Sequence, residues 1–231
     1  MKIYTIVYNE EFLLPYFIKH YKDRFPHCEI FVYDNESTDK TADIAKEMGC
    51  TVIPYNTNGQ YSQPDFSGKK STIWKGNDDW TMIVDCDEFC DITEEDIKYE
   101  EENGTTVILF DCYSMVGNDK NFNPTTINMG YRDRFYDKSY CFNSKKIETV
   151  EYSIGSHFAR IEGYVKFSKK HYPVYHYKYL SLEYLLERCH DYQPRLVQED
   201  LQWGFNEQFA RSDDDITKEF ILAKSKSNKL K

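Results

Sequence analysis

Short apolar runs punctuate the first 55 residues of the chain. Residues 3–8, 29–33 and 51–55 each have the length of a buried strand, and polar stretches of helical length separate them. Alternation of strands with helices is typical of a sheet with parallel strands and crossover helices. Pro54 places the third strand at its end or near a sheet edge, because proline cannot donate a ladder hydrogen bond. The pattern predicts a β-α-β-α-β unit.

Two helices are expected between these strands. Residues 14–24 can form the first, since Pro15 is tolerated in the first turn. The second follows Ser37 or Thr38, either of which can cap a helix N-terminus, and Gly49 stands just beyond its end.

The middle of the chain predicts further strands. A polar segment at 56–68 is expected to be a loop and residues 69–76 a helix. Apolar runs at 80–84 and 105–111 are the next expected strands, and Asp111 closes the second of them.

The final third of the chain has shorter predicted strands, followed by predicted helices. Residues 145–180 contain short β-like pieces. Residues 181–192 have helical periodicity, with Ser181 as the expected cap. A second helix is expected in the segment that begins SDDDIT. No linker divides the chain, so residues 1–231 are expected to form one α/β domain with a C-terminal helical extension.

Polar residues follow three of the expected strands. Asn9 and Glu10 follow the first, Asp34 ends the second, and Asp85 and Asp87 follow the run at 80–84. In open parallel sheets, ligands bind beyond the carboxyl ends of the strands. Two carboxylates on one side of an extended backbone repel each other unless a cation lies between them, and Mg²⁺ or Mn²⁺ accepts such oxygen ligands together with a diphosphate.

Composition narrows the classes of protein. The net charge of −10 argues against nucleic-acid binding. The seven cysteines are odd in number and lack a CxxC pair, which favours a reducing compartment without disulfides. No apolar run reaches the length of a membrane span or a signal peptide, so a cytoplasmic protein is expected.

Six ordered segments resemble glycosyltransferases of the GT-A fold, in particular the family 2-like group and its DUF23-type relatives. The segments are IVYNEEFLLPYFIKHY, IFVYDNESTDKT, WKGNDDWTMIVDCDEF, YSMVG, KKIETVEYSIGSH and VYHYKYLSLEYLLER. The resemblance implies a single GT-A domain in which residues 1–112 bind the nucleotide sugar and residues 113–180 face the acceptor. Residues 181–231 would form C-terminal helices and a tail.

The resemblance also implies an activity: metal-dependent, inverting transfer of a sugar from a nucleoside diphosphate, with UDP expected, to a hydroxyl of a glycan or other acceptor. Asp85, Asp87 and His176 would hold Mn²⁺ or Mg²⁺. The residues assigned to the nucleotide sugar are Tyr8, Asn9, Glu10, Asp34, Lys69, Trp74, Asp85 and Cys86. Lys70 competes with Lys69 for the role of a diphosphate-binding cation.

The general base is the open assignment. The acidic motif that many inverting relatives carry late in the fold has no clear counterpart before Glu199. Asp111 is favoured, because a strand end on the ligand-binding rim can reach a substrate. His157, in the sequence GSH, is the second catalytic candidate, and Glu151 is a third.

Two other readings compete. A phosphatase of the haloacid dehalogenase type also places DxD after an apolar strand, and Asp85 would then be the nucleophile. Those enzymes carry the motif on their first strand, whereas here it follows a later one. A non-catalytic nucleotide-sugar-binding module would keep the pocket without turnover.

Overall fold

The computed structural model describes residues 1–117 and 123–230. Its N-terminal half is a parallel sheet in the order β4-β1-β2-β3. The strands are β1 (Lys2–Val7), β2 (Glu29–Asp34), β3 (Thr51–Pro54) and β4 (Trp80–Ile83). The expected β-α-β-α-β unit is confirmed, and β3 forms the edge at which Pro54 needs no ladder partner.

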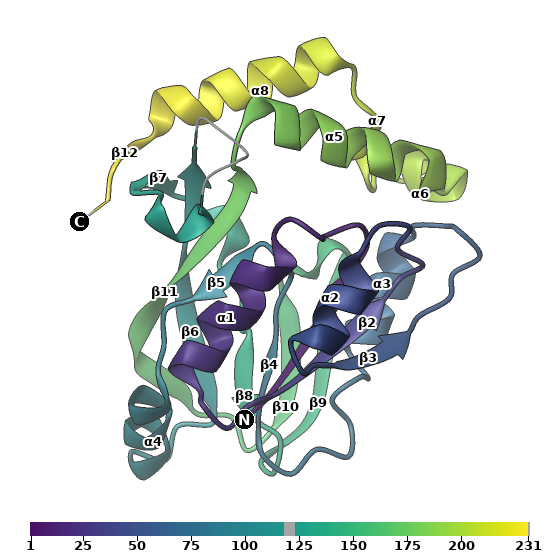
Figure 1. Cartoon of the computed structure of the whole chain (residues 1–231). Coiled ribbons are helices and arrows are strands. Elements are labelled where there is room, and N and C mark those ends of the chain that lie inside the picture. The colour runs from purple at the N-terminus through teal and green to yellow at the C-terminus, as the bar shows by residue number, and fades with distance from the viewer. Residues whose placement is uncertain (118–122, 231) are drawn as a thin grey trace.

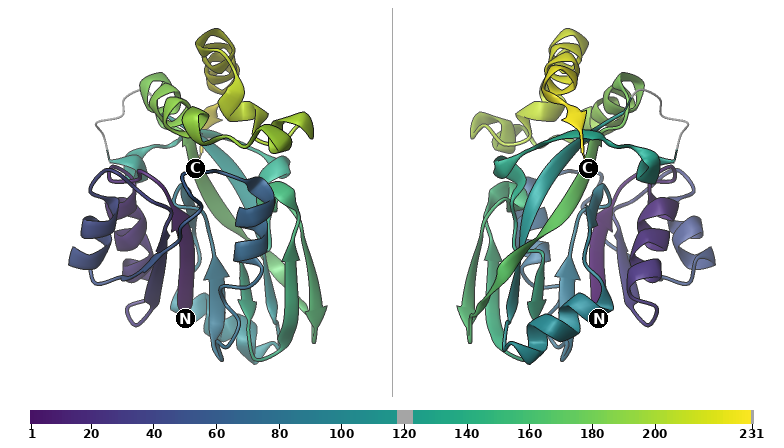
Figure 2. Two further views of the ribbon diagram at one scale, coloured as in Figure 1. Left: turned by 90° about the vertical axis from the view of Figure 1, so that its right-hand side faces the viewer. Right: turned by 90° about the vertical axis from the view of Figure 1, so that its left-hand side faces the viewer.

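Alternating side chains of β1 build two cores. Ile3 and Val7 pack into one core with α1 (Leu14–Arg24) and α2 (Thr41–Glu47). Tyr4 and Ile6 pack into the other core with α3 (Gln63–Lys70). Successive residues of a strand face opposite sides, so each layer of helices receives its own apolar set. Figure 2 shows α1 and α2 on one side of the sheet.

The second half of the sheet is mixed. Its longest strands, β6 and β11, run parallel, while β8 joins the sheet antiparallel between β4 and β6. A separate two-stranded ribbon is formed by β9 and β10. The bounds are β5 (Glu88–Cys90), α4 (Glu94–Glu102), β6 (Val107–Val116), β7 (Met129–Arg132), β8 (Cys141–Asn143), β9 (Ile147–Tyr152), β10 (Ala159–Gly163), β11 (Phe167–Tyr179) and β12 (Asn228–Lys229).

The C-terminal helices lie across the carboxyl ends of β1, β2 and β4 (Figure 1). They are α5 (Leu182–Tyr192), α6 (Gln198–Gln202), α7 (Glu207–Ala210) and α8 (Asp213–Lys226). Ser181 caps α5 as predicted, since its hydroxyl accepts a hydrogen bond from the Tyr184 amide. The α/β fold class with a C-terminal helical extension is therefore confirmed. No helix in the described ranges has the length and apolarity to cross a bilayer.

Three sequence predictions were wrong in detail. The helix expected at 69–76 lies at Gln63–Lys70, where Phe66 packs against Tyr55 and Tyr61 and so stabilises a segment that reads as a polar loop. The second helix begins only at Thr41, because the Ser37 hydroxyl accepts from the Asn9 amide instead of capping a helix. The strand expected to end at Asp111 continues to Val116.

Candidate functional site

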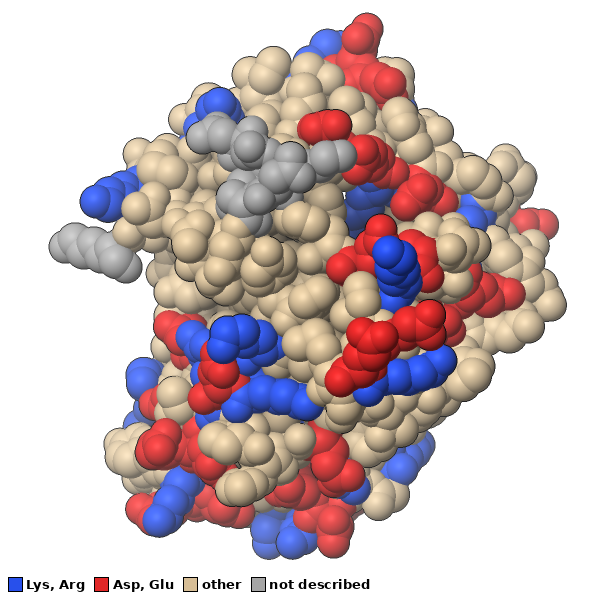
Figure 3. Space-filling view, in the orientation of Figure 1, with Lys and Arg blue, Asp and Glu red and all other residues tan. Residues whose placement is uncertain are grey.

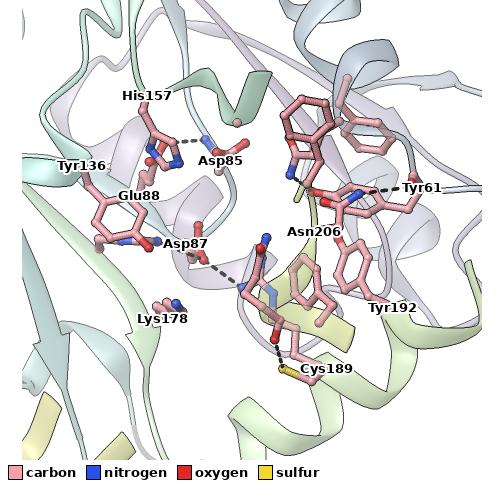
Figure 4. A pocket seen from close by; sticks show the side chains of 18 of the residues that line it. Tyr61, Asp85, Asp87, Glu88, Tyr136, His157, Lys178, Cys189, Tyr192 and Asn206 are labelled. Atoms are coloured by element: carbon pink, nitrogen blue, oxygen red, sulfur yellow. Dashed lines mark hydrogen bonds and ion pairs between the residues drawn. The ribbon is translucent and has the colours of Figure 1, made fainter. Parts of the chain in front are cut away.

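A cavity of about 440 Å³ lies where the C-terminal helices meet the carboxyl end of β4. Figure 4 shows its two sides. Charged side chains line one side, and aromatic rings with Asn206 line the other. The turn that holds Asp85, Cys86 and Asp87 borders the charged side.

The turn after β4 is built by Glu88. Oε2 of Glu88 accepts a hydrogen bond from the backbone amide of Asp85 at 2.9 Å, and Oε1 accepts from Nζ of Lys138 at 2.6 Å and from the Tyr140 hydroxyl at 3.0 Å. Glu88 is buried, so its charge requires these donors. Glu88 is therefore a structural support for the backbone at Asp85.

Asp85 is paired with two lysines. Its carboxylate lies 2.5 Å from Nζ of Lys70 and 3.4 Å from Nζ of Lys138. Burial alone would raise the pKa of Asp85, but the two ammonium groups hold it well below its usual value. Asp85 is therefore ionised at neutral pH and carries its own counter-charges.

Asp87 faces a different pair of groups. Its Oδ2 lies 2.9 Å from Nη1 of Arg188 and 3.4 Å from Nε2 of His176. Burial favours the neutral acid, yet Arg188 and His176 outweigh it and keep the pKa of Asp87 low. Nη2 of Arg188 also lies 3.2 Å from Glu10, whose pKa burial raises to about 7 despite that cation.

Five cations line this cavity: Lys70, Lys138 and Arg188 lie at the acidic turn, and Lys178 and Arg211 lie beside Glu219. Each is paired with at least one carboxylate, and Lys178 lies 2.7 Å from Oε1 of Glu219. Such a group of ammonium and guanidinium donors in a partly desolvated cavity suits the oxygens of a phosphate or diphosphate.

His157 borders the cavity beside two aromatic rings. Its imidazole centroid lies 4.5 Å from that of Phe135 and 5.1 Å from that of Tyr136. Burial, with the nearby Lys138 charge, lowers the pKa of His157 to about 4, so the ring is neutral at physiological pH. Gly155 has φ +79, and a Cβ there would lie 2.9 Å from the His157 ring, so glycine makes room for the imidazole.

The opposite side of the cavity is aromatic. Tyr61 contacts Tyr192 and Phe209 at centroid distances of 4.7 and 5.7 Å, and Tyr192 stacks on Phe209 at 4.6 Å. Asn206 is buried at their edge, and no described residue donates to its Oδ1. An apolar face beside an unpaired amide oxygen fits a ring that carries hydroxyl donors.

A second cavity of about 320 Å³ lies beside the first, between the loop after β1 and α5. Tyr8, Asn9 and Glu10 line it, whereas Cys86 borders only the first cavity. The remaining carboxylates of its wall are Glu11, Asp39, Glu187 and Asp191. Figure 3 shows acidic side chains gathered around a recess between α5 and the upper ends of α1 and α2.

Arg195 closes the space between Tyr8 and the end of β2. Its guanidinium carbon lies 3.7 Å from the Tyr8 ring centroid, and its Nη2 donates to Oδ1 of Asn35 at 2.7 Å. The side chain is buried, and no described residue accepts from its Nη1.

Five predicted residues border neither cavity. Asp34 accepts a long hydrogen bond of 3.4 Å from the Ser37 amide, and Lys69 lies over the rings of Tyr33 and Tyr55, so Lys70 is the lysine at the DxD turn. Trp74 is buried against Phe142 in the core.

Asp111 is the fourth, and the basis of its selection was wrong. It lies within β6 rather than at its end, 2.7 Å from Arg132 and 2.9 Å from Nδ1 of His171. Glu151, the third candidate for the base, is exposed on β9 and borders neither cavity.

The predicted metal ligands meet only in part. Asp87 and His176 approach closely enough to share an ion, and their oxygen and imidazole donors suit Mn²⁺ or Mg²⁺. Within residues 1–117 and 123–230, no group of three or more His, Cys, Asp and Glu side chains is placed to hold one metal. Asp85 is turned to its lysines instead. The residues fit a two-ligand site, which Mg²⁺ commonly completes with phosphate oxygens and water.

Sequence reasoning missed Lys138, Lys178 and Arg188. Two of them carried a usable signal. Lys178 follows His176 by two residues on a strand, so both side chains share a face. Arg188 lies between Tyr184 and Tyr192 at four-residue spacing, which places one cation within the buried stripe of α5.

The chain is similar to a family model, a curated protein and several solved structures. The family model for glycosyl transferase family 2 matches residues 2–161. Protein RfbJ of Shigella flexneri is 33% identical over 86 residues, which are 36% of this chain and 61% of RfbJ. The crystal structure of S. aureus TarS has a TM-score of 0.49 at 14% identity, covering 95% of this chain and 42% of TarS. Glucosyl-3-phosphoglycerate synthase from Mycobacterium tuberculosis, in complex with Mn²⁺, UDP and glucosyl-3-phosphoglycerate, has a TM-score of 0.33 at 14% identity. The match covers 49% of this chain and 43% of the synthase.

Proposed function

Because the chain belongs to glycosyl transferase family 2, we propose that it transfers a sugar from a nucleoside diphosphate, UDP in the first instance, to a hydroxyl of a glycan or other acceptor. The observation that carries the proposal is the cavity in which Asp85 and Asp87 lie among Lys70, Lys138 and Arg188. A donor diphosphate supplies the negative charge that this group of cations can accept.

We assign Asp87 and His176 as the protein ligands of Mn²⁺ or Mg²⁺. When bound, the ion stabilises negative charge on the leaving diphosphate as a Lewis acid. Asp85 has a different part in this assignment. Lys70 and Lys138 orient its carboxylate, and they can contact phosphate oxygens from the same position.

His157 is the general base of the proposed reaction. Its neutral imidazole borders the cavity, whereas Asp111 is held outside it by Arg132 and His171. In the inverting reaction, the acceptor oxygen forms a bond to the anomeric carbon as the bond to the diphosphate breaks. The diphosphate leaves with the electron pair, and the acceptor proton passes to His157.

We propose that the two sides of the cavity divide the substrates. The donor diphosphate lies against the charged side, and the second cavity, lined by Tyr8 and Asn9, leads towards the nucleoside. A sugar ring of the acceptor lies against Tyr61, Tyr192 and Asn206, where ring stacking and a hydroxyl donor both have partners. In this arrangement, residues 1–112 supply the carboxylates that face the donor, and residues 113–180 supply His157 and His176. The C-terminal helices close the site.

The seven free cysteines support a cytoplasmic setting, since unpaired thiols persist in a reducing compartment. The catalytic proposal is tested by a thermal-shift screen of nucleotide sugars with Mn²⁺, followed by an assay for release of the nucleoside diphosphate. A stabilising donor that is hydrolysed or transferred supports a transferase. Tight binding without turnover would identify a binding module instead, and stabilisation by no nucleotide sugar would refute the donor site.

A further inference from the structure

Arg188 occupies a central position between the two cavities. Its side chain is 19% exposed, and it joins Asp87, Glu10 and the Tyr184 hydroxyl through its two terminal nitrogens. Arg188 and Glu10 line both cavities, so their ion pair forms part of the partition between them. Arg188 also lies beyond residues 2–161, the part of the chain that the family model matches.

Arg188 and a metal would use the same oxygen. Oδ2 of Asp87 is the atom that lies 2.9 Å from Nη1 of Arg188, and it is also the atom that faces Nε2 of His176 at 3.4 Å. A close guanidinium and a divalent cation at one carboxylate oxygen oppose each other, because the two positive charges repel in a poorly solvated site.

We propose that Arg188 couples metal binding to donor binding: it holds Asp87 in the absence of a donor and transfers its guanidinium to the diphosphate when a donor enters. This inference rests on the proposed function, because it requires a diphosphate in the first cavity. A diphosphate offers Arg188 two charged oxygens in the geometry that a guanidinium binds bidentately.

The exchange has to be concerted. A buried carboxylate that loses one partner is strongly destabilised unless another cation replaces it. Departure of Arg188 from Asp87 therefore favours metal entry at Asp87 and His176, and a metal at that point favours departure of Arg188. Glu10 stays beside the guanidinium and limits how far it moves. Donor and metal consequently bind with positive coupling.

The coupling can be measured without turnover. Mn²⁺ affinity is determined by electron paramagnetic resonance of the free ion, with and without UDP, for wild type, Arg188→Gln and Arg211→Gln. Arg211 lines the same cavity and pairs with Glu219, so its substitution removes the same charge without touching Asp87. Circular dichroism establishes that each variant is folded, and Arg188→Lys serves as a second variant.

For wild type we expect UDP to tighten Mn²⁺ binding by about 10-fold or more, within the usual range of coupling between sites. Arg188→Gln should bind Mn²⁺ about 10-fold more tightly than wild type without UDP, bind UDP more weakly, and lose most of the coupling. Arg188→Lys should lie between the two, and Arg211→Gln should behave as wild type.

If Arg188→Gln binds Mn²⁺ no more tightly than Arg211→Gln does in the absence of UDP, Arg188 does not compete for the metal site. Failure of wild type to bind UDP would instead refute the donor site. The Mn²⁺ affinities measured without UDP would still show whether Arg188 competes with the metal for Asp87.

Discussion

Nζ of Lys138 lies 2.6 Å from Oε1 of Glu88, and the two side chains are only 6% and 2% exposed. This buried pair supports the turn that presents Asp85, because Glu88 also accepts the Asp85 amide. A lysine 50 residues away in sequence thus shapes the acidic turn.

Substitution of Lys138 by methionine should destabilise the protein by about 3 kcal/mol, because Glu88 would remain as an uncompensated buried charge. Urea unfolding measures the change. Lys146→Met is the control, since Lys146 is exposed and its loss should change the free energy of unfolding by less than about 0.5 kcal/mol. Equal stabilities of the two variants would show that the buried pair has no net effect.

Asp87→Ala should abolish the metal-dependent stabilisation by UDP, because it removes the only carboxylate that faces His176 within the described site. In wild type, UDP with Mn²⁺ at about 100 times its Kd should add about 2.7 kcal/mol to the free energy of unfolding. Thermal shift with and without EDTA measures the difference. A variant that retains the full Mn²⁺-dependent shift would show that the ion binds elsewhere.

His157→Ala should lower kcat for transfer by about 10²-fold or more while leaving UDP affinity close to wild type, as loss of a general base does. Since the pKa of His157 is about 4, the wild-type rate should stay constant from neutral pH downward and fall as the ring is protonated near pH 4. A pH profile of kcat within the range where the protein stays folded measures the onset of that fall. Wild-type kcat in the alanine variant would rule out His157 as the base.

Asp111→Asn should leave donor binding and transfer near wild type. Asp111 contacts Arg132 and His171 outside both cavities, and its side chain is 35% exposed, so loss of the charge should reduce stability by about 1 kcal/mol at most. Steady-state kinetics measures transfer, and urea unfolding measures the change in stability. Loss of transfer with donor binding intact would restore Asp111 as the base.

His20 should make the protein less stable in acid. It is buried, its Nε2 lies 2.9 Å from the carbonyl oxygen of Cys90, and burial, together with the Arg24 charge, lowers its pKa to about 4. Between pH 6.5 and 4 the unfolded chain binds a proton at His20 that the native state does not, so stability falls as pH falls through this window, by about 3 kcal/mol for this residue. His20→Gln should reduce that slope in urea titrations at several pH values. An unchanged slope would assign acid sensitivity to other groups.

Local sequence was sufficient for the first three strands of the fold. The strands near 3–8, 29–33 and 51–55 are found close to their expected bounds, because short apolar runs between polar stretches favour buried strands. The position of Asp85 and Asp87 after a buried strand was likewise readable, since it depends on the chain's own order.

Contacts between distant segments were not readable in this way. Phe66 stabilises α3 by packing against Tyr55 and Tyr61, which precede the helix in the chain. The extension of β6 past Asp111 depends on its pairing with β11.

The sequence by itself determined the parallel α/β core and the acidic turn, because strand length, periodicity and helix signals are local properties. Only the tertiary structure decided which cations face that turn. Lys138 and Arg188 reach Asp85 and Asp87 from segments 53 and 101 residues away. Burial then requires each carboxylate to have a counter-charge, so the fold selects partners that no spacing in the sequence specifies.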